Sequence, residues 1–229
     1  MLTTRAGGVS APPYASFNLG DHVGDRPGAV AANRERLAAG LGLPVQRLVW
    51  MEQVHGRAVA EVGGPRPDPV PATDALVTRE PGLAVAVLVA DCVPVLLADP
   101  VARVVGAAHA GRVGARIGVL TATLEAMRQL GAQIEQVEVL LGPSACGSCY
   151  EVPADMQAQV DAGLPGSACR TRQGTAGLDL RAGLWQQLAA AGVARIGVDP
   201  RCTIEDPALY SYRREGVTGR LAAVTWFEQ

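Results

Sequence analysis

The sequence contains no lysine, so its 20 basic residues are all arginine. Without a lysine amine the chain cannot form a Schiff base with a carbonyl substrate, nor can it build a Walker-type phosphate loop, which requires that residue. The 22 acidic residues leave a net charge of −2, which gives no long-range attraction to nucleic acid or anionic lipid. We therefore expect neither nucleic acid nor a membrane among the partners of this protein.

Long apolar runs are absent as well. The longest one, residues 83–90, is too short to span a bilayer. The N-terminal residues lack the apolar segment that an export signal requires. The five cysteines are an odd number, as is common when thiols stay reduced. These features predict a cytoplasmic protein.

The middle of the chain carries the clearest strand signals. Residues 83–89, 93–98 and 104–108 are apolar runs separated by short turns, as expected for strands buried on both faces. Further strands are expected at 47–51, 58–62, 137–141, 195–198 and 221–226, and helices at 27–42, 114–130, 154–162 and 180–191. Residues 1–27 and 63–73 look like loops. Since no repeat or linker is evident, the sequence predicts one mixed α/β domain over residues 1–229.

The chain has three histidines, and two of them flank a cysteine in sequence. These two histidines and the cysteine lie in turns beside expected strands. They are His55, Cys92 and His109. Imidazole and thiolate are the ligands that zinc prefers, and three protein ligands with an open position are typical of a catalytic site. The sulfur also admits copper. The alternative is that they are separate residues, the histidines solvated or in the core and the cysteine a small buried apolar residue.

Other motifs carry weaker signals. The spacing of Cys146 and Cys149 suggests a zinc knuckle or a redox pair, but no second ligand pair is evident, which favours two unlinked thiols in a tight turn. Arg5, Arg112 and Arg213 each belong to a segment that could clamp an anion, because a guanidinium forms paired hydrogen bonds with phosphate.

Taken together and in order, these segments resemble the laccase-domain family, whose members have been called multicopper polyphenol oxidases, purine nucleoside phosphorylases and peptidoglycan editing factors. The resemblance covers almost the whole chain. The matching segments are residues 3–10, 18–20, 22–25, 33–34, 53–56, 90–94, 107–111, 142–143, 149–152 and 212–214.

The resemblance implies a single compact α/β domain with helices packed on mixed β-sheets, in a layered sandwich like that of cysteine hydrolases. It implies that His55, Cys92 and His109 are the zinc ligands. The implied activity is phosphorolysis of adenosine and inosine, with methylthioadenosine cleavage and adenosine deamination as related activities. A multicopper oxidase couples a blue copper to a trinuclear cluster, which needs more than three histidines, so we discount that activity.

The sequence departs from the family in two places. The family usually continues His-Ala-Gly with Trp-Arg-Gly, whereas here Arg112-Val113-Gly114 follows, so the loop has no indole. The chain also starts close to the Thr3-Thr4-Arg5 motif, where many relatives first have a strand. We therefore expect either a shortened start or a missing first strand.

The expected partners are purine nucleosides and phosphate, and we expect the protein to be a monomer. Asp91 is expected to serve as general base or to support a histidine. Arg213, and then Arg5 or Arg112, would bind phosphate. The expected nucleoside contacts are Gln53, Asn18 and Tyr150.

The rival hypothesis needs no metal. Cys92 would then be a nucleophile activated by His109 or His55, in a cysteine hydrolase or amidase. Removal of wrongly incorporated amino acids from peptidoglycan precursors is a third hypothesis, compatible with either chemistry.

Overall fold

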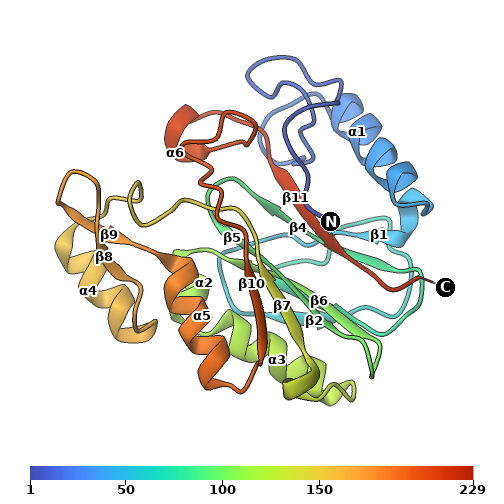
Figure 1. Ribbon diagram of the computed structural model, residues 1–229. Helices are drawn as coiled ribbons and strands as arrows, with labels where there is room; N and C mark the ends of the chain where they lie inside the picture. The colour runs from blue at the N-terminus through green and yellow to red at the C-terminus, as the bar shows by residue number, and fades with distance from the viewer. Residues whose placement is uncertain (229) are drawn as a thin grey trace.

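Two larger sheets and one small hairpin make up the strands of the computed structural model, which describes residues 1–228 (Figure 1). The three-stranded sheet has the order β1 (Leu48–Val49), β4 (Ala84–Val89), β11 (Leu221–Thr225). The six-stranded sheet has the order β10 (Arg195–Val198), β7 (Glu138–Leu141), β5 (Val93–Asp99), β6 (Val104–Ala110), β3 (Ala75–Thr78), β2 (Val59–Glu61). The hairpin pairs β8 (Ala168–Arg170) with β9 (Ala176–Leu178). Parallel and antiparallel pairs both occur in each larger sheet.

Helices cover the outer faces of the two larger sheets, which gives a layered α/β sandwich (Figure 1). The helix α1 (Pro27–Gly40) packs on the three-stranded sheet. On the other side, the six-stranded sheet is covered by α2 (Arg112–Arg116), α3 (Val119–Gln129) and α5 (Leu180–Ala190). The remaining helical elements are α4 (Ala154–Gly163) on the hairpin, α6 (Tyr212–Glu215), and the 3-10 turns η1 (Val45–Arg47) and η2 (Ile134–Gln136). The predicted mixed α/β class is confirmed.

Strand β4 contributes to two cores because successive side chains of a strand point to opposite faces. Val85, Val87 and Val89 pack against the six-stranded sheet, in the core between the sheets. Ala84, Ala86 and Leu88 face the other way, into the core that contains Leu37 of α1. The small alanines allow the helix layer to approach the sheet closely.

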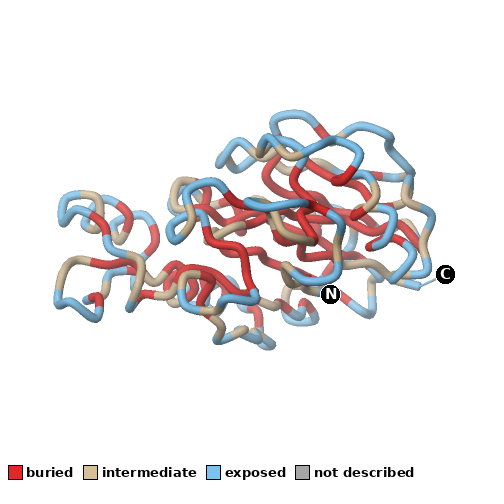
Figure 2. The backbone as a smooth tube through the Cα atoms, turned by 90° about the horizontal axis from the view of Figure 1, so that it is seen from above, coloured by how far each residue is buried: buried red, intermediate tan, exposed pale blue. Residues whose placement is uncertain are grey.

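The three apolar runs that the sequence marked as buried strands are β4, β5 and β6, and almost every residue in them is buried. Figure 2 shows the buried segments concentrated along the sheets, with exposed loops at the periphery. No helix within the described residues is both long and apolar enough to cross a membrane.

The structure differs from the sequence prediction at several elements. The helix expected at 114–130 is two helices, because Gly118 adopts a left-handed backbone with φ of 90° and ends the first one. The short strand β3 and the β8–β9 hairpin were not predicted. Strand β3 has only four residues and directly follows the proline-rich loop, so it lacks the length on which strand patterns depend.

Candidate metal and nucleoside site

The register of β5 and β6 explains how Cys92 and His109 come together. In this antiparallel pair, Val93 lies opposite Ala110 and Pro94 lies opposite His109. Cys92 is the residue immediately before β5, so it emerges at the end of the sheet where β6 finishes. Cys92 is half-buried, and His109 is only 3% exposed.

Asp74 brings the third residue, His55, to the same place. It directly precedes β3, the other neighbour of β6, and its backbone carbonyl accepts a hydrogen bond from the His109 amide at 2.7 Å. The fully buried Asp74 carboxylate accepts from the backbone amides of Val54, His55 and Gly56 at 3.2, 2.9 and 2.6 Å. The loop that carries His55 is thus tied to the strand that carries His109.

The three side chains form a tight group. Their ligand atoms all lie within 4.8 Å of one another, and Cys92 Sγ is 3.8 Å from His55 Nε2. The two imidazole rings meet edge to face, with centroids 4.7 Å apart. Gly111 is required beside them, because a Cβ at this position would lie 2.7 Å from His55 Cδ2 and 3.1 Å from Cys92 Sγ.

Two non-glycine residues of the site have left-handed backbones, His55 with φ of 59° and Asp91 with φ of 89°. This conformation costs roughly 1–2 kcal/mol for a residue with a Cβ. Hydrogen bonds hold both residues in place: the His55 amide donates to Asp74, and the Asp91 carboxylate accepts from Thr203 and Arg213.

The electrostatics of the group favour a thiolate next to an imidazolium. Burial by itself would raise the pKa of Cys92, but His109 and His55 outweigh it and lower that pKa to about 6. Burial would likewise lower the pKa of His109, whereas the charges and hydrogen bonds of Cys92 and Asp74 raise it to about 9. Burial works to raise the pKa of Asp74, but the hydrogen bond from His109 and the loop amides lower it. At neutral pH the sulfur therefore carries negative charge, as a metal ligand must.

A cavity of about 400 Å³ opens over this group. Three arginines, Arg112, Arg213 and Arg220, belong to its wall. The guanidinium of Arg213 lies 5.0 Å from the centre of the Tyr150 ring, a cation–π contact. The other lining residues are His22, Gln53, His55, Leu88, Val89, Ala90, Asp91, Cys92, His109, Ala145, Tyr150, Leu180 and Tyr212.

The Asp91 carboxylate is directed toward the 203–213 region rather than toward the histidines. It accepts a hydrogen bond from the Thr203 hydroxyl at 2.6 Å and another from the Arg213 backbone amide at 2.6 Å. Asp91 therefore positions the segment that carries Arg213. The carboxylate that supports a histidine is that of Asp74, which accepts a hydrogen bond from His109 Nδ1 at 2.8 Å.

The remaining predicted contacts fall into two groups. Gln53 lines the cavity, with its amide bonded to both backbone groups of Leu88 at 2.7 and 2.8 Å, and Tyr150 and Arg112 also line it. Asn18 and Arg5 are not among the described residues that line the cavity. Asn18 is fully buried and bonds the Arg220 amide at 2.8 Å, whereas Arg5 forms an ion pair with Glu215 at 2.7 Å.

The sequence did not point to Asp74, His22 or Arg220 as site residues. A carboxylate directly before a strand is a usable signal for Asp74, but its partners are fixed only by long-range pairing. Burial lowers the pKa of Arg220, and the negative charges of Cys92 and Asp91 oppose that change. Arg220 is therefore a partly desolvated cation beside the thiolate.

Two imidazole nitrogens and one sulfur are a donor set that suits zinc and also admits copper. The hydrogen bond from His109 Nδ1 to Asp74 leaves Nε2 as the nitrogen available to an ion, an arrangement common among metal-binding histidines. The residues present therefore fit a metal ion, and the open cavity leaves room for a further ligand.

Comparisons with known proteins identify the family to which the whole chain is similar. The model of the family described as multi-copper polyphenol oxidoreductase laccase matches residues 1–228. A Mycobacterium bovis protein named purine nucleoside phosphorylase is 58% identical over 228 residues, covering 100% of this chain and 91% of its own length. A Corynebacterium glutamicum protein of the same name is 57% identical, with 99% and 93% coverage. The crystal structure of YlmD from Geobacillus stearothermophilus superposes with a TM-score of 0.92 at 36% identity, covering 100% of this chain and 91% of that one.

Proposed function

The chain belongs to the multi-copper polyphenol oxidoreductase laccase family, and on that basis we propose that it is a metal-dependent purine nucleoside phosphorylase. One observation carries the proposal: the His55, Cys92 and His109 group and three arginines line the same cavity of about 400 Å³. A nucleoside and a phosphate ion need such a pairing of a polar reaction centre with cationic walls. The names of the relatives that are 58% and 57% identical to this chain support the same activity.

His55, Cys92 and His109 would hold the metal, with zinc the ion that best matches two imidazoles and a thiolate. When bound, a divalent ion supplies Lewis-acid stabilisation of negative charge on oxygen. Asp74 fixes the orientation of His109 and the position of the His55 loop, so the ligand set is arranged before an ion arrives.

Arg213 and Arg112 would bind the phosphate, because guanidinium groups form paired hydrogen bonds with its oxygens. Asp91 holds the Arg213 backbone, and Tyr150 lies against the Arg213 guanidinium, so both residues limit its freedom. The rings of Tyr150 and Tyr212 in the cavity wall offer faces on which a purine can stack.

In phosphorolysis, a phosphate oxygen forms a bond to C1′ of the ribose while the bond from C1′ to the purine nitrogen breaks. The bonding electron pair leaves with the purine, which takes up a proton. The arginines keep the phosphate oxygens close to C1′ and neutralise part of their charge, and the partly closed cavity excludes bulk water from the reacting atoms. Adenosine, inosine and methylthioadenosine all contain the bond that breaks, and we place them together as the substrate class.

Adenosine deamination is the related second activity of the same site. Water would replace phosphate as the nucleophile, and its attack at purine C6 would displace ammonia. The two activities need different binding modes. In deamination, C6 of the purine would face the His55, Cys92 and His109 group, whereas in phosphorolysis C1′ of the ribose would face it.

A metal-free cysteine hydrolase or amidase is the second candidate, and one feature favours it. Asp74, His109 and Cys92 form an ordered series in which the carboxylate orients the imidazole and the imidazole lies beside the thiolate. The same order of groups activates the nucleophile in cysteine hydrolases. Its substrates would be amides, including those of peptidoglycan precursors.

One experiment tests the proposal against this alternative. Purified protein is incubated with adenosine, with and without phosphate, before and after treatment with a chelator, and the products are separated by chromatography. Release of adenine that requires phosphate and stops on chelation is the expected result, and added zinc should restore it. Absence of purine chemistry in every arm, together with covalent trapping of Cys92 by an electrophile, would instead support the hydrolase.

A further inference from the structure

A second group of ligand-type side chains lies in the turns that follow β7 and β10. It consists of Cys146, Cys149, Cys202 and Glu205, whose ligand atoms all lie within 4.8 Å of one another. The sequence showed only its first half, because the second half is a Cys-x-x-Glu spacing, not a further cysteine pair. We call these four residues the three-thiol cluster.

Each half of the cluster is a tight turn. The Cys149 amide donates a hydrogen bond to the Cys146 carbonyl at 3.0 Å, and the Glu205 amide donates to the Cys202 carbonyl at 3.2 Å. Both turns therefore bring side chains separated by three positions close together. They face each other because β7 and β10 are adjacent parallel strands, so the turns after them leave the same edge of the sheet.

Contacts across the cluster lower the pKa of Cys202 and of Glu205, whereas burial raises the pKa of the Cys146 and Cys149 thiols. The Cys146 amide donates to Cys202 Sγ at 3.4 Å, and Cys146 Sγ lies 4.0 Å from a Glu205 carboxylate oxygen. Arg172, from the β8–β9 hairpin, forms an ion pair with the same carboxylate at 2.5 Å. Backbone amides that donate to sulfur are a common outer contact of thiolate ligands, and Arg172 would offset part of the negative charge of the four ligands when a metal ion is bound.

We propose that Cys146, Cys149, Cys202 and Glu205 bind a structural zinc ion, separate from the ion assigned to His55, Cys92 and His109. Three sulfurs and one oxygen complete a tetrahedral set. Zinc–sulfur bonds of about 2.3 Å place sulfurs about 3.8 Å apart in such a set, so ligand atoms within 4.8 Å need to close up by about 1 Å or less. All four positions are taken by the protein, as in structural rather than catalytic zinc sites.

A thiol-redox pair fits the cluster less well. Redox pairs of this spacing lie at the start of a helix, which activates one sulfur, whereas residues 146–149 form a turn and α4 begins only at Ala154. All five cysteines of the chain are free thiols in the structure. A thiol–disulfide pair also uses only two cysteines, whereas this cluster has three cysteines and a carboxylate.

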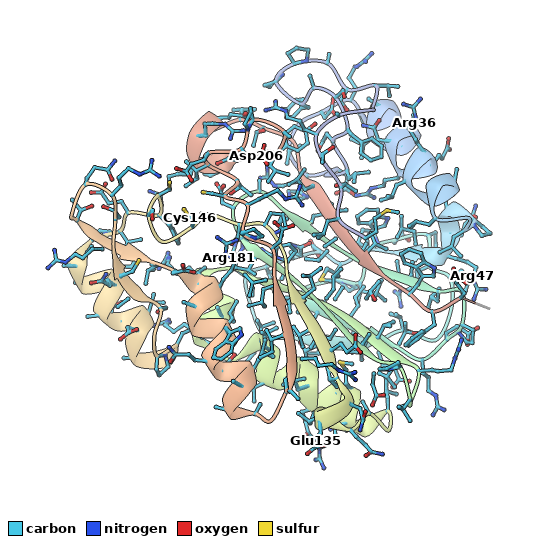
Figure 3. The ribbon with its side chains drawn as sticks, viewed as in Figure 1. Arg36, Arg47, Glu135, Cys146, Arg181 and Asp206 are labelled. Atoms are coloured by element: carbon cyan, nitrogen blue, oxygen red, sulfur yellow. The ribbon has the colours of Figure 1, made fainter. Side chains whose placement is uncertain are left out.

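The ion would join two walls of the cavity. Residues 144–150 supply Ala145 and Tyr150 to the wall, and residues 202–213 supply Tyr212 and Arg213. Arg181 of α5 secures the approach to Cys202 by donating to the Arg201 carbonyl at 3.1 Å. Figure 3 labels Arg181 on α5, Cys146 on the segment after β7 and Asp206 on the segment after β10. A zinc ion bound by the cluster would therefore hold together two segments that line the cavity.

Cobalt absorption tests the proposal without disturbing the cluster. In the Cys92→Ala variant, the first site has no sulfur, so a sulfur-to-cobalt charge-transfer band can arise only elsewhere. We expect this variant to bind one equivalent of cobalt with such a band, and zinc to displace the cobalt and abolish it. A folded Cys92→Ala protein that shows no band and retains no zinc after dialysis would overturn the proposal.

Further substitutions in the Cys92→Ala background locate the ligands. Cys149→Ser and Cys202→Ser should each remove the band and the retained zinc, and zinc should no longer raise Tm. Cys169→Ser is the matched control, since Cys169 is a nearby free cysteine whose Sγ bonds the Gly147 carbonyl at 3.4 Å. Glu205→Gln keeps all three sulfurs and should weaken binding without abolishing the band.

Two results would contradict the proposal even if a serine variant fails to fold. One is loss of the zinc in Cys169→Ser to the same degree as in Cys149→Ser. The other is a disulfide between two of the cluster cysteines, found by mass spectrometry in protein purified with zinc and a reductant.

Discussion

One carboxylate oxygen of Asp74 lies 2.8 Å from His109 Nδ1 and also accepts the His55 amide at 2.9 Å, so a single buried group orients both imidazole-bearing segments. This relationship joins three places that are far apart in sequence. It makes Asp74 a positioning residue for the whole ligand group.

The first prediction concerns Asp74→Asn. An amide would place an NH₂ group against donors that now meet a carboxylate oxygen, so His109 and the His55 loop would lose their common support. We expect metal affinity to fall by about 10–100-fold, with turnover falling in parallel, as for other outer-shell substitutions. Titration with zinc and a competing chelator measures the affinity. Asp68→Asn, in an exposed loop, is the control and should leave both quantities unchanged; equal losses in the two variants would contradict the role of Asp74.

The second prediction concerns the ligands. Cys92→Ala or His109→Ala should abolish turnover and remove metal from the first site together, while circular dichroism shows an intact fold. Cys169→Ala should keep both. A Cys92→Ala protein that has lost this metal and retains full phosphorolysis would exclude the metal-dependent mechanism.

The third prediction concerns pH in protein freed of metal by a chelator. Because the pKa of Cys92 is lowered to about 6, its alkylation by iodoacetamide should be slow below pH 6, rise through pH 6 and level off above it. His109→Gln removes the cationic partner, so the Cys92 pKa should rise and alkylation at pH 7 should fall by roughly tenfold. Mass spectrometry of the Cys92 peptide follows the rate. A midpoint near the ordinary value of 9.0 in the unsubstituted protein would contradict the thiolate assignment.

The fourth prediction concerns phosphate binding. Arg213→Ala removes a guanidinium from the cavity wall, so KM for phosphate should rise by about tenfold or more, the cost of a charge-assisted hydrogen bond. KM for the nucleoside should change less. Arg195→Ala is the control, because Arg195 is exposed and forms an ion pair with Glu138 at 3.1 Å on the outer strand pair. An unchanged KM for phosphate in Arg213→Ala would remove Arg213 from the phosphate site.

The fifth prediction concerns space at the ligand group. In Gly111→Ala the new methyl group would meet His55 Cδ2 at 2.7 Å, so the imidazole must move. Zinc affinity should fall by about tenfold or more while Tm changes little, because the exposed His55 can shift toward the cavity. Gly63→Ala meets no atom within 4 Å and should have no effect on zinc affinity.

The buried central strands could be predicted from the sequence because β4, β5 and β6 are continuous apolar runs, a signal that does not depend on distant residues. The hairpin β8–β9 could not, since its strands have only three residues each, too few to show a strand pattern. The break at Gly118 was missed because the apolar spacing continues across it, and only the backbone geometry ends the first helix.

The candidate site was predictable in part for the same reason. His55, Cys92 and His109 lie in or beside turns at strand ends, which sequence patterns locate. Asp74 and the Cys202–Glu205 half of the three-thiol cluster depend on which strands become neighbours. That pairing is set by the sheet order, in which β3 joins β6 and β7 joins β10, and no local pattern specifies it.

Strand β4 has a consequence for how this protein can change over evolution. Its valines belong to one core and its alanines to another, while Leu88 and Val89 also line the cavity. A substitution at Leu88 or Val89 therefore changes the packing of a core and the wall of the cavity together. The edge strands β2 and β10 are more exposed, and none of their residues lines the cavity. New substrate preferences are therefore expected to arise from the loops around the cavity, with β4 held nearly constant.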